Sequence, residues 1–170
     1  MKGYIQVYTG NGKGKTTAAI GLCLRASGAG KNVYIGQFIK GMHYSELDIL
    51  PTIENITLKQ YGRGCFIYSE PVQEDYTAAL NGLAEIGIIL QSGEYDVVVL
   101  DEVNIALYYG LFSFDDLKQL LINRASHVEV IITGRYAPQE LIDMADLVTE
   151  MKEIKHYYTK GVEARTGIEK

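Results

Sequence analysis

One segment constrains the fold more than any other feature of the sequence: the glycine-rich stretch T-G-N-G-K-G-K-T-T-A-A at positions 9–19. The alternating run Y-I-Q-V-Y directly before it predicts a β-strand. Helical periodicity follows over 15–27, with Ile20, Leu24 and Ser27 on one face. A strand, a glycine loop ending in G-K-T and a helix together form a phosphate-binding loop. We therefore expect the chain to bind a nucleotide through this segment.

The first glycine of the loop stands one position later than usual. The common pattern G-x-x-x-x-G-K-[ST], aligned on the G-K-T of this chain, would place a glycine at position 9. The chain has Thr9 there and Gly10 next. Glycines that turn backbone N–H groups inward, the positive end of a helix dipole and the charge of Lys15 still favour phosphate binding, and the Thr16 hydroxyl can bind magnesium. The alternative, a glycine-rich turn with incidental lysines, explains the flanking strand and helix less well.

Short β-branched runs alternate with longer segments of helical periodicity, which is typical of an α/β fold with a mainly parallel sheet and helices on both faces. The most apolar run, Y-D-V-V-V-L-D-E at 95–102, predicts a central strand. Other strands are expected at 33–38, 56–61, 128–134 and 147–154. Helices are expected at 72–91, after the Ser113–Asp116 capping pattern, and from Pro138 to about Ala145. With 170 residues, the chain is expected to form a single domain over 1–170.

Composition and charge exclude several classes of protein. The formal net charge of −5 provides no broad basic surface, so no nucleic-acid partner is expected. No run reaches the roughly 18 consecutive apolar residues of a membrane span, and the first residues lack the pattern of an export signal. We therefore expect a cytoplasmic protein that has no membrane partner. Cys23 and Cys65 form no C-x-x-C motif and are expected to be reduced thiols.

Two carboxylates, Asp101 and Glu102, end the apolar run at 95–102. Ligands of open α/β sheets bind at the carboxyl ends of the strands, and a carboxylate there can hold a metal ion that bridges nucleotide phosphates. A solvated strand end is the other interpretation, because such ends are often acidic. The phosphate-binding loop favours the metal site, and both carboxylates are candidates for its ligand.

Two further segments have no role that spacing alone defines. Residues 62–71 contain Phe66 and Tyr68, which either fold back into the core or present aromatic faces to a large flat ligand. Residues 155–170 combine glycines, an arginine and an aromatic pair without a period, which predicts a shaped loop, with a frayed end as the alternative. The histidines at positions 43, 127 and 156 lack metal-ligand spacing and are expected to be structural or solvated.

Five segments of the chain, taken in order, together form the pattern of a known protein family. They are T-G-N-G-K-G-K-T-T-A-A, G-Q-F-I-K-G, V-V-L-D-E-V-N-I-A-L-Y-Y-G, T-G-R-Y-A-P-Q-E-L-I-D-M-A-D-L-V-T-E-M and K-H-Y-Y-T-K-G-V-E-A-R-T-G-I-E. From Tyr4 to Glu169 the chain resembles the P-loop type of ATP:corrinoid adenosyltransferase, also called cob(I)yrinic acid a,c-diamide adenosyltransferase. The loop together with T-G-R and the G-V-x-A-[RQ]-x-G-I-E tail makes this resemblance specific. It implies a P-loop NTPase architecture of the RecA-like type.

The resemblance implies an activity that accounts for the displaced glycine. Enzymes of this family transfer the 5′-deoxyadenosyl group of ATP to the Co(I) of a reduced corrinoid and release triphosphate, in the biosynthesis or salvage of adenosylcobalamin. Their ATP lies in the loop in the reverse of the usual direction. A shifted glycine is consistent with a loop that leaves the ribose C5′ free to react.

The resemblance also implies roles for single residues. Lys15 and Glu102 are expected to be catalytic. Thr16 and Glu102, rather than Asp101, are expected to hold Mg²⁺ or Mn²⁺. Contacts to ATP are expected from Gly10, Asn11, Gly12, Lys13, Gly14, Lys15, Thr16, Thr17 and Arg135.

Corrinoid contacts are expected from Arg63, Phe66 and Tyr68. Relatives use apolar side chains of this loop to displace the lower axial ligand of cobalt, which favours reduction of Co(II). Many of them read G-x-G-F-x-W, whereas this chain reads G-R-G-C-F-I-Y. The aromatic pair is therefore either shifted by one residue or replaced by Cys65 and Ile67. The resemblance further implies a flavoprotein electron donor and a homodimer.

Two other functions stay open at this point. A P-loop kinase or ATPase would attack the γ-phosphate and release ADP instead of triphosphate. A non-catalytic protein would bind ATP or a corrinoid without forming a cobalt–carbon bond. Product analysis separates the first from adenosyl transfer, and a light-sensitive product separates the second.

Overall fold

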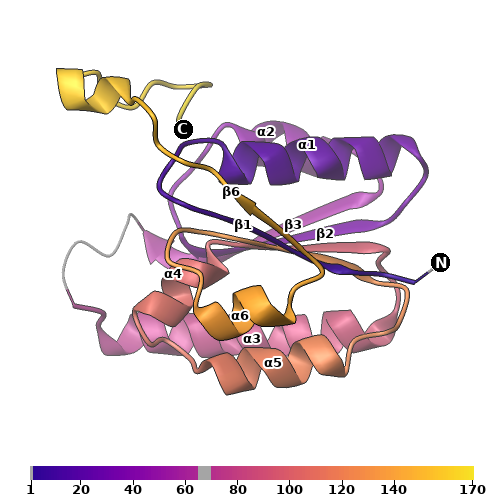
Figure 1. Cartoon of the computed structure of the whole chain (residues 1–170). Helices are drawn as coiled ribbons and strands as arrows, with labels where there is room; N and C mark the ends of the chain where they lie inside the picture. Colours follow the sequence, from indigo (N-terminus) through magenta and orange to yellow (C-terminus); the bar gives the residue numbers. More distant parts are fainter. Residues whose placement is uncertain (1, 65–69) are drawn as a thin grey trace.

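The computed structural model describes residues 2–64 and 70–170 and has a six-stranded sheet at its centre (Figure 1). The strand order is β3-β2-β4-β5-β1-β6, and all neighbouring strands are parallel. The strands are β1 (Ile5–Thr9), β2 (Val33–Lys40), β3 (Ile56–Gly64), β4 (Val97–Asp101), β5 (Glu129–Thr133) and β6 (Leu147–Glu150). Each overlaps a run that the sequence predicted, which confirms the α/β class.

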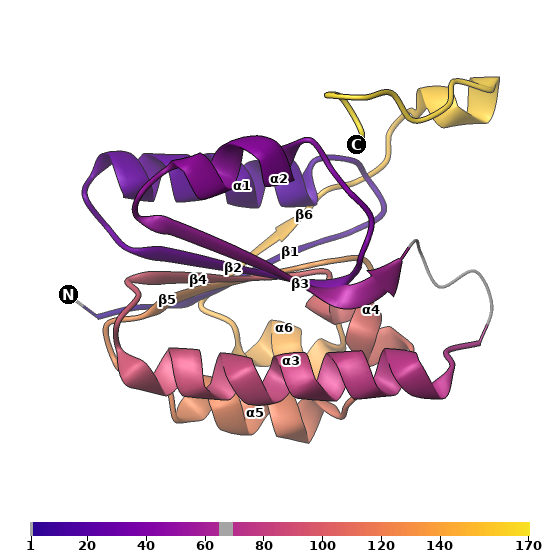
Figure 2. The same cartoon turned by 180° about the vertical axis from the view of Figure 1, so that it is seen from behind.

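Helices cover both faces of the sheet, as Figure 2 shows from behind. Helices α1 and α2 lie on one face, and α3 to α6 lie on the other. The helices are α1 (Lys15–Gly28), α2 (Glu46–Ile49), α3 (Gln73–Ser92), α4 (Val103–Tyr108), α5 (Phe114–Ile122) and α6 (Gln139–Met144). This arrangement confirms the P-loop NTPase-like architecture. Over residues 2–64 and 70–170, no helix is long and apolar enough to cross a membrane.

The central strand β4 is buried along its whole length. Val98 and Leu100 belong to the cluster of apolar side chains that contains those of α3 to α6. Val97 and Val99 belong to the cluster that contains those of α1. Because side chains alternate along a strand, a strand covered on both faces needs an apolar residue at every position. This accounts for the uninterrupted apolar run in the sequence.

The face of α1 that packs on the sheet consists of small residues. Ala19, Cys23 and Ala26 are buried, whereas Leu24, on the face that the apolar period favours, is 47% exposed. The apolar periodicity of the sequence therefore identified the helix but not its fully buried face. Burial raises the pKa of the Cys23 thiol to about 12, so this cysteine is a protonated free thiol, as expected. Cys65 lies outside the described residues.

The caps of two helices follow from local sequence. Ser113 and Asp116 form a reciprocal capping box at α5, with the Asp116 N–H donating to Ser113 Oγ at 3.1 Å and the Ser113 N–H donating to Asp116 Oδ2 at 3.0 Å. This confirms the capping pattern. Pro138 precedes α6 as its cap, and the helix begins at Gln139, one residue later than expected. A cap residue keeps extended backbone angles, which Pro138 has at ψ 151°.

The carboxyl ends of the strands meet at one edge of the sheet (left in Figure 1). The phosphate-binding loop, α4 and the C-terminal segment, residues 151–170, lie at the same edge. Three described non-glycine residues have left-handed backbone angles, and they follow or end strands at this edge: Ile39 (φ 65°), Glu102 (φ 60°) and Tyr136 (φ 62°). Such conformations cost about 1–3 kcal/mol each and concentrate at functional sites. The backbone strain thus points to this edge as the site.

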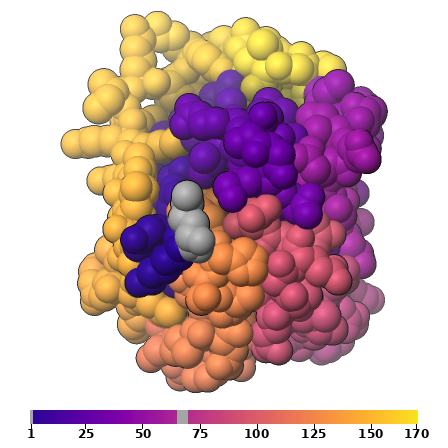
Figure 3. All heavy atoms as spheres, turned by 90° about the vertical axis from the view of Figure 1, so that its right-hand side faces the viewer, coloured from indigo at the N-terminus to yellow at the C-terminus, as the bar shows by residue number. Residues whose placement is uncertain are grey.

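The opposite edge of the sheet carries the start of the chain (Figure 3, indigo residues beside orange ones). The Gly3 N–H donates to the Ser126 carbonyl at 2.9 Å, and the Arg124 guanidinium donates to the Gly3 carbonyl at 3.2 Å. These contacts anchor β1 at the end away from the loop.

Candidate active site

The phosphate-binding loop packs against the residue that follows β6. Gly10 has a left-handed backbone (φ 93°), and a Cβ atom at this position would lie 2.5 Å from the Met151 carbonyl oxygen. The Gly12 N–H donates to the same oxygen at 2.6 Å. A side chain at position 10 would therefore collide with the backbone of Met151. The displaced glycine is the one that this packing requires.

Lys15 lies within the loop and is only 8% exposed. Its ammonium donates to the carbonyl oxygens of Gly10 at 2.8 Å and Gly12 at 2.7 Å. Burial lowers the pKa of Lys15, although the nearby carboxylates of Glu102 and Asp101 oppose this shift. A lysine ammonium has three N–H groups, so one remains for a ligand in the loop.

Asp101, at the end of β4, has its acceptor positions filled. Oδ1 accepts hydrogen bonds from the hydroxyls of Thr16 at 2.8 Å and Thr133 at 2.6 Å. Oδ2 accepts from Lys40 at 2.7 Å and Gln37 at 3.3 Å. Burial opposes ionisation of this carboxyl, but the Lys40 ammonium and the hydroxyls hold its pKa below the usual range. Asp101 is thus an ionised group that orients its neighbours.

A residue with a left-handed backbone in β2 brings Lys40 to Asp101. The register between β2 and β3 shifts between Phe38 and Lys40, and the intervening Ile39 has a left-handed backbone. In a regular strand Lys40 would lie on the face opposite to Gln37. The left-handed Ile39 breaks this alternation, and the side chains of Gln37 and Lys40 both contact Asp101. Residue spacing in the sequence did not identify Lys40 as part of the site. The only sequence signal for it was its place in the G-Q-F-I-K-G segment, one of the five that carry the family resemblance.

Glu102 follows Asp101 and differs from it in its contacts. Among the described residues its carboxylate has no hydrogen bond or ion pair. Burial, with the nearby charge of Asp101, raises the pKa of Glu102 to about 7. The glycine of T-G-R lies against this site, because a Cβ on Gly134 (φ 129°) would be 2.9 Å from Asn104 Cβ and 3.3 Å from Glu102 Oε2. Glu102 is therefore a partly buried carboxylate whose oxygens, within the described part of the chain, are free to bind a ligand.

Thr16 and Glu102 could together hold a divalent cation. The Thr16 hydroxyl donates its proton to Asp101, so its oxygen lone pairs remain available. No cluster of three or more acidic, histidine or cysteine side chains fit for a metal occurs within residues 2–64 and 70–170. Magnesium at nucleotide sites needs only one or two protein oxygens, because phosphates and water supply the rest. The hydroxyl and the carboxylate fit this requirement.

The remaining candidate residues are divided between the site and its surroundings. Arg135 is exposed and near enough to Lys15 and Glu102 to affect the pKa of both. Arg63 is exposed at the end of β3 and pairs with Glu74 at 3.1 Å. Phe66 and Tyr68, like their possible replacements Cys65 and Ile67, lie outside the described residues. Asn11 and Thr17 are exposed on the loop.

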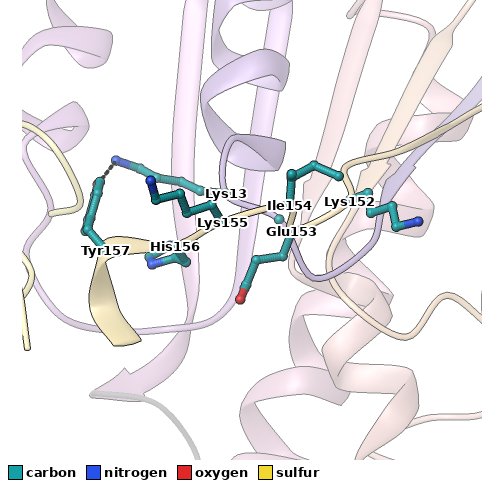
Figure 4. Close-up of a pocket in the computed structure, with 8 residues that line it drawn as sticks. Lys13, Lys152, Glu153, Ile154, Lys155, His156 and Tyr157 are labelled. Carbon is teal, nitrogen blue, oxygen red and sulfur yellow. Dashed lines mark hydrogen bonds between the residues drawn. The ribbon is translucent and has the colours of Figure 1, made fainter. Parts of the chain in front are cut away.

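The C-terminal segment lies beside the loop, and a pocket of about 310 Å³ separates them. It is lined by Gly12, Lys13, Lys152, Glu153, Ile154, Lys155, His156 and Tyr157. Figure 4 shows Lys13 directed toward Tyr157, with a hydrogen bond of 3.1 Å between Nζ and Oη. The shaped-loop interpretation agrees with the short 3₁₀ turn at Tyr157–Lys160. His43 and His156 are accounted for by local contacts with Asp48 and with the Tyr158 N–H.

Comparison with known proteins gives the family. A family model described as ATP:corrinoid adenosyltransferase BtuR/CobO/CobP matches residues 1–169. The chain is 38% identical to the corrinoid adenosyltransferase CobA of Salmonella typhimurium over 169 residues, covering 99% of this chain and 86% of that protein. It is 36% identical to the corrinoid adenosyltransferase of Escherichia coli K12 with the same coverage. Identity to that of Pseudomonas aeruginosa is 34%, covering 99% of this chain and 84% of the relative. The chain therefore belongs to the ATP:corrinoid adenosyltransferase family.

Proposed function

We propose that this protein transfers the 5′-deoxyadenosyl group of ATP to the Co(I) of a reduced corrinoid and releases triphosphate, in the synthesis or salvage of adenosylcobalamin. Membership of the family supports this activity. The observation that carries it is the meeting of three features at one edge of the sheet: a phosphate-binding loop, a lysine with one spare N–H, and a carboxylate that has no partner within residues 2–64 and 70–170. A triphosphate and its cation would satisfy all three.

The reaction requires alignment more than activation. Co(I) is already a strong nucleophile, so no protein base has to deprotonate it. Its electron pair forms the bond to C5′ while the C5′–oxygen bond breaks and its electrons leave with triphosphate. Holding the two substrates in line is worth up to about 7–11 kcal/mol of the barrier.

The loop residues would stabilise the leaving group. Negative charge grows on the bridging oxygen of triphosphate, and the spare N–H of Lys15 and the loop amides can donate to it. Thr16 and Glu102 would hold Mg²⁺ or Mn²⁺, which supplies further positive charge when it is bound. Arg135, exposed beside Glu102, is a further phosphate contact in this proposal. Asp101 acts on this set indirectly, by fixing the Thr16 hydroxyl.

Changing Glu102 to glutamine is expected to weaken the metal dependence of transfer. A neutral amide is a poorer ligand for a hard dication, and even indirect partners of metal ligands are worth about 10–100-fold in metal affinity. We expect the metal concentration for half-maximal rate to rise by about 100-fold or more. Titrating Mg²⁺ and Mn²⁺ against the transfer rate measures this. If Asp101→Asn, in a folded protein, shifted this concentration more than Glu102→Gln, Asp101 would be the ligand.

The corrinoid side of the proposal rests on Phe66 and Tyr68. If they press on the lower face of the corrin, truncating either to alanine lets an axial ligand return to cobalt and makes Co(II) harder to reduce. Transfer with a biological reductant should fall, while ATP affinity stays unchanged. Chemically prepared Co(I) should restore most of the rate.

Ordinary core residues would behave differently under the same truncations. The loss of a buried phenylalanine costs roughly 3–5 kcal/mol of stability, and activity would then fall alike with either source of electrons. Melting temperatures measured beside the two rates distinguish these cases. A destabilised variant without rescue by Co(I) would contradict the axial-ligand role.

The proposal extends to the setting of the enzyme. We include a flavoprotein as the electron donor, a homodimeric assembly and a cytoplasmic location, all of which the family resemblance and the composition suggest.

The phosphate-containing product that is released from ATP tests the reaction class directly. Triphosphate in amounts equal to the adenosylated corrinoid supports the proposal, whereas ADP would support a kinase or ATPase.

A further inference from the structure

Lys13 of the phosphate-binding loop is bound by the C-terminal segment. Its ammonium donates to Tyr157 Oη at 3.1 Å, to the Ile168 carbonyl oxygen at 3.1 Å and to Glu169 Oε1 at 2.8 Å. These contacts join residues from the two ends of the sequence, and Figure 1 shows the segment above the edge of the sheet where the loop lies. They are specific, because three different groups converge on one nitrogen.

The two lysines of the loop differ in how many ammonium N–H groups remain free to bind a ligand. An ammonium has three of them, and the three partners of Lys13 use all three. Lys15 gives two to loop carbonyls and keeps one. Lys15 also lies inside the loop, whereas the side chain of Lys13 is 38% exposed and extends toward Tyr157 (Figure 4). Lys15 can therefore bind a phosphate with the N–H group that it has left. Lys13 would first have to break one of its three hydrogen bonds.

Glu169 is the centre of the contacts within the segment. Its carboxylate accepts from Lys13, from the Arg165 backbone N–H at 2.9 Å, from the Arg165 guanidinium at 3.1 Å and 3.3 Å, and from the Tyr157 hydroxyl. The guanidinium also stands 5.0 Å from the centroid of the Tyr157 ring. The Arg165 guanidinium, with Lys13 and Tyr157, holds the pKa of Glu169 well below its usual range. The segment is folded around this carboxylate, and Lys13 is its link to the loop.

We propose that Lys13 is a positioning residue that fastens the C-terminal segment over the phosphate-binding loop through Glu169, rather than a ligand of phosphate. The link keeps the wall of the pocket between the loop and residues 152–157 in place. A fixed wall there limits the freedom of the loop and the access of water to a bound nucleotide. The inference rests on the proposed function only in that the loop binds ATP.

A double-mutant cycle of Lys13→Met and Glu169→Gln tests this role, with two measurements on the full chain. Amide hydrogen exchange of residues 156–169 without ATP reports whether the segment is fastened, and calorimetric titration gives the ATP affinity. We expect each variant to speed the exchange and to weaken ATP binding by a similar factor, about 10-fold. The double variant should be no weaker than either single one. Lys160→Met, which removes a charge of the segment that has no side-chain hydrogen bond or ion pair among the described residues, should change neither measurement.

Two results would overturn the inference. If Lys13 contacts phosphate, Lys13→Met weakens ATP binding while Glu169→Gln does not, or the two effects add in the double variant. If the segment is not held by this link, exchange stays at the wild-type rate in Lys13→Met. A wild-type protein that binds no ATP would contradict the proposed function, and with it the role of Lys13, whereas unequal variants of an ATP-binding protein contradict only the inference.

Discussion

Replacing Lys15 with alanine is expected to abolish detectable ATP binding and to reduce adenosyl transfer by about 1000-fold or more. The change removes the one full charge that lies inside the loop, together with the N–H group that is free for phosphate. Calorimetric titration of ATP and the initial rate of transfer with Co(I) corrinoid measure the two effects. The variant should remain folded, which its circular dichroism spectrum checks.

A lysine elsewhere in the chain provides the control for this prediction. Lys31 follows α1 and pairs with Asp96 at 3.3 Å, away from the loop. Lys31→Ala removes the same charge and should leave ATP affinity and transfer unchanged. Normal turnover in Lys15→Ala would contradict the assignment of the phosphate site.

Replacing Lys40 with methionine is expected to lower the free energy of unfolding by about 3–5 kcal/mol. The ammonium lies 2.7 Å from Asp101 Oδ2, and the two side chains are 9% and 1% exposed. Without its partner the Asp101 carboxylate is left as a buried charge, which is costly. Urea unfolding followed by circular dichroism measures the change.

An exposed ion pair supplies the comparison for this effect. Lys59 lies 2.7 Å from Glu85, but the side chains are 51% and 38% exposed. Lys59→Met should cost only about 0–1 kcal/mol, because water screens such pairs. Equal losses in Lys40→Met and Lys59→Met would show that Lys40 does not support the buried site. Asp101→Asn should resemble Lys40→Met in stability, since it breaks the same pair.

Much of the fold could be predicted because its central strands are buried on both faces. The run V-V-V-L-D of β4 is apolar at nearly every position, and the capping box at Ser113 depends on neighbouring residues only. The fully buried face of α1 could not be predicted from apolar periodicity, because its apolar residues are two alanines and a cysteine, while Ile20 and Leu22 are only partly buried. The short helix α4 has Glu102 as its N-cap, and the left-handed backbone of this residue is not a usual cap signal.

The candidate site could be predicted in part. The loop and the two carboxylates follow from residue types at known spacings, but the difference between Asp101 and Glu102 depends on hydrogen bonds from β2, β5 and α1. Lys40 reaches the site because the left-handed Ile39 breaks the alternation of β2, and the sequence carries no signal of that backbone conformation. The partners of Lys13 lie at the far end of the chain, so no local pattern joins them.

Anaerobic incubation of the protein with ATP, magnesium and chemically prepared Co(I) corrinoid tests the central claim most directly. The proposed function predicts a new visible spectrum of a cobalt–carbon bond, its loss on exposure to light, and one triphosphate for each corrinoid adenosylated. An unchanged spectrum after light exposure, with ADP and phosphate as the only products of ATP, would contradict it.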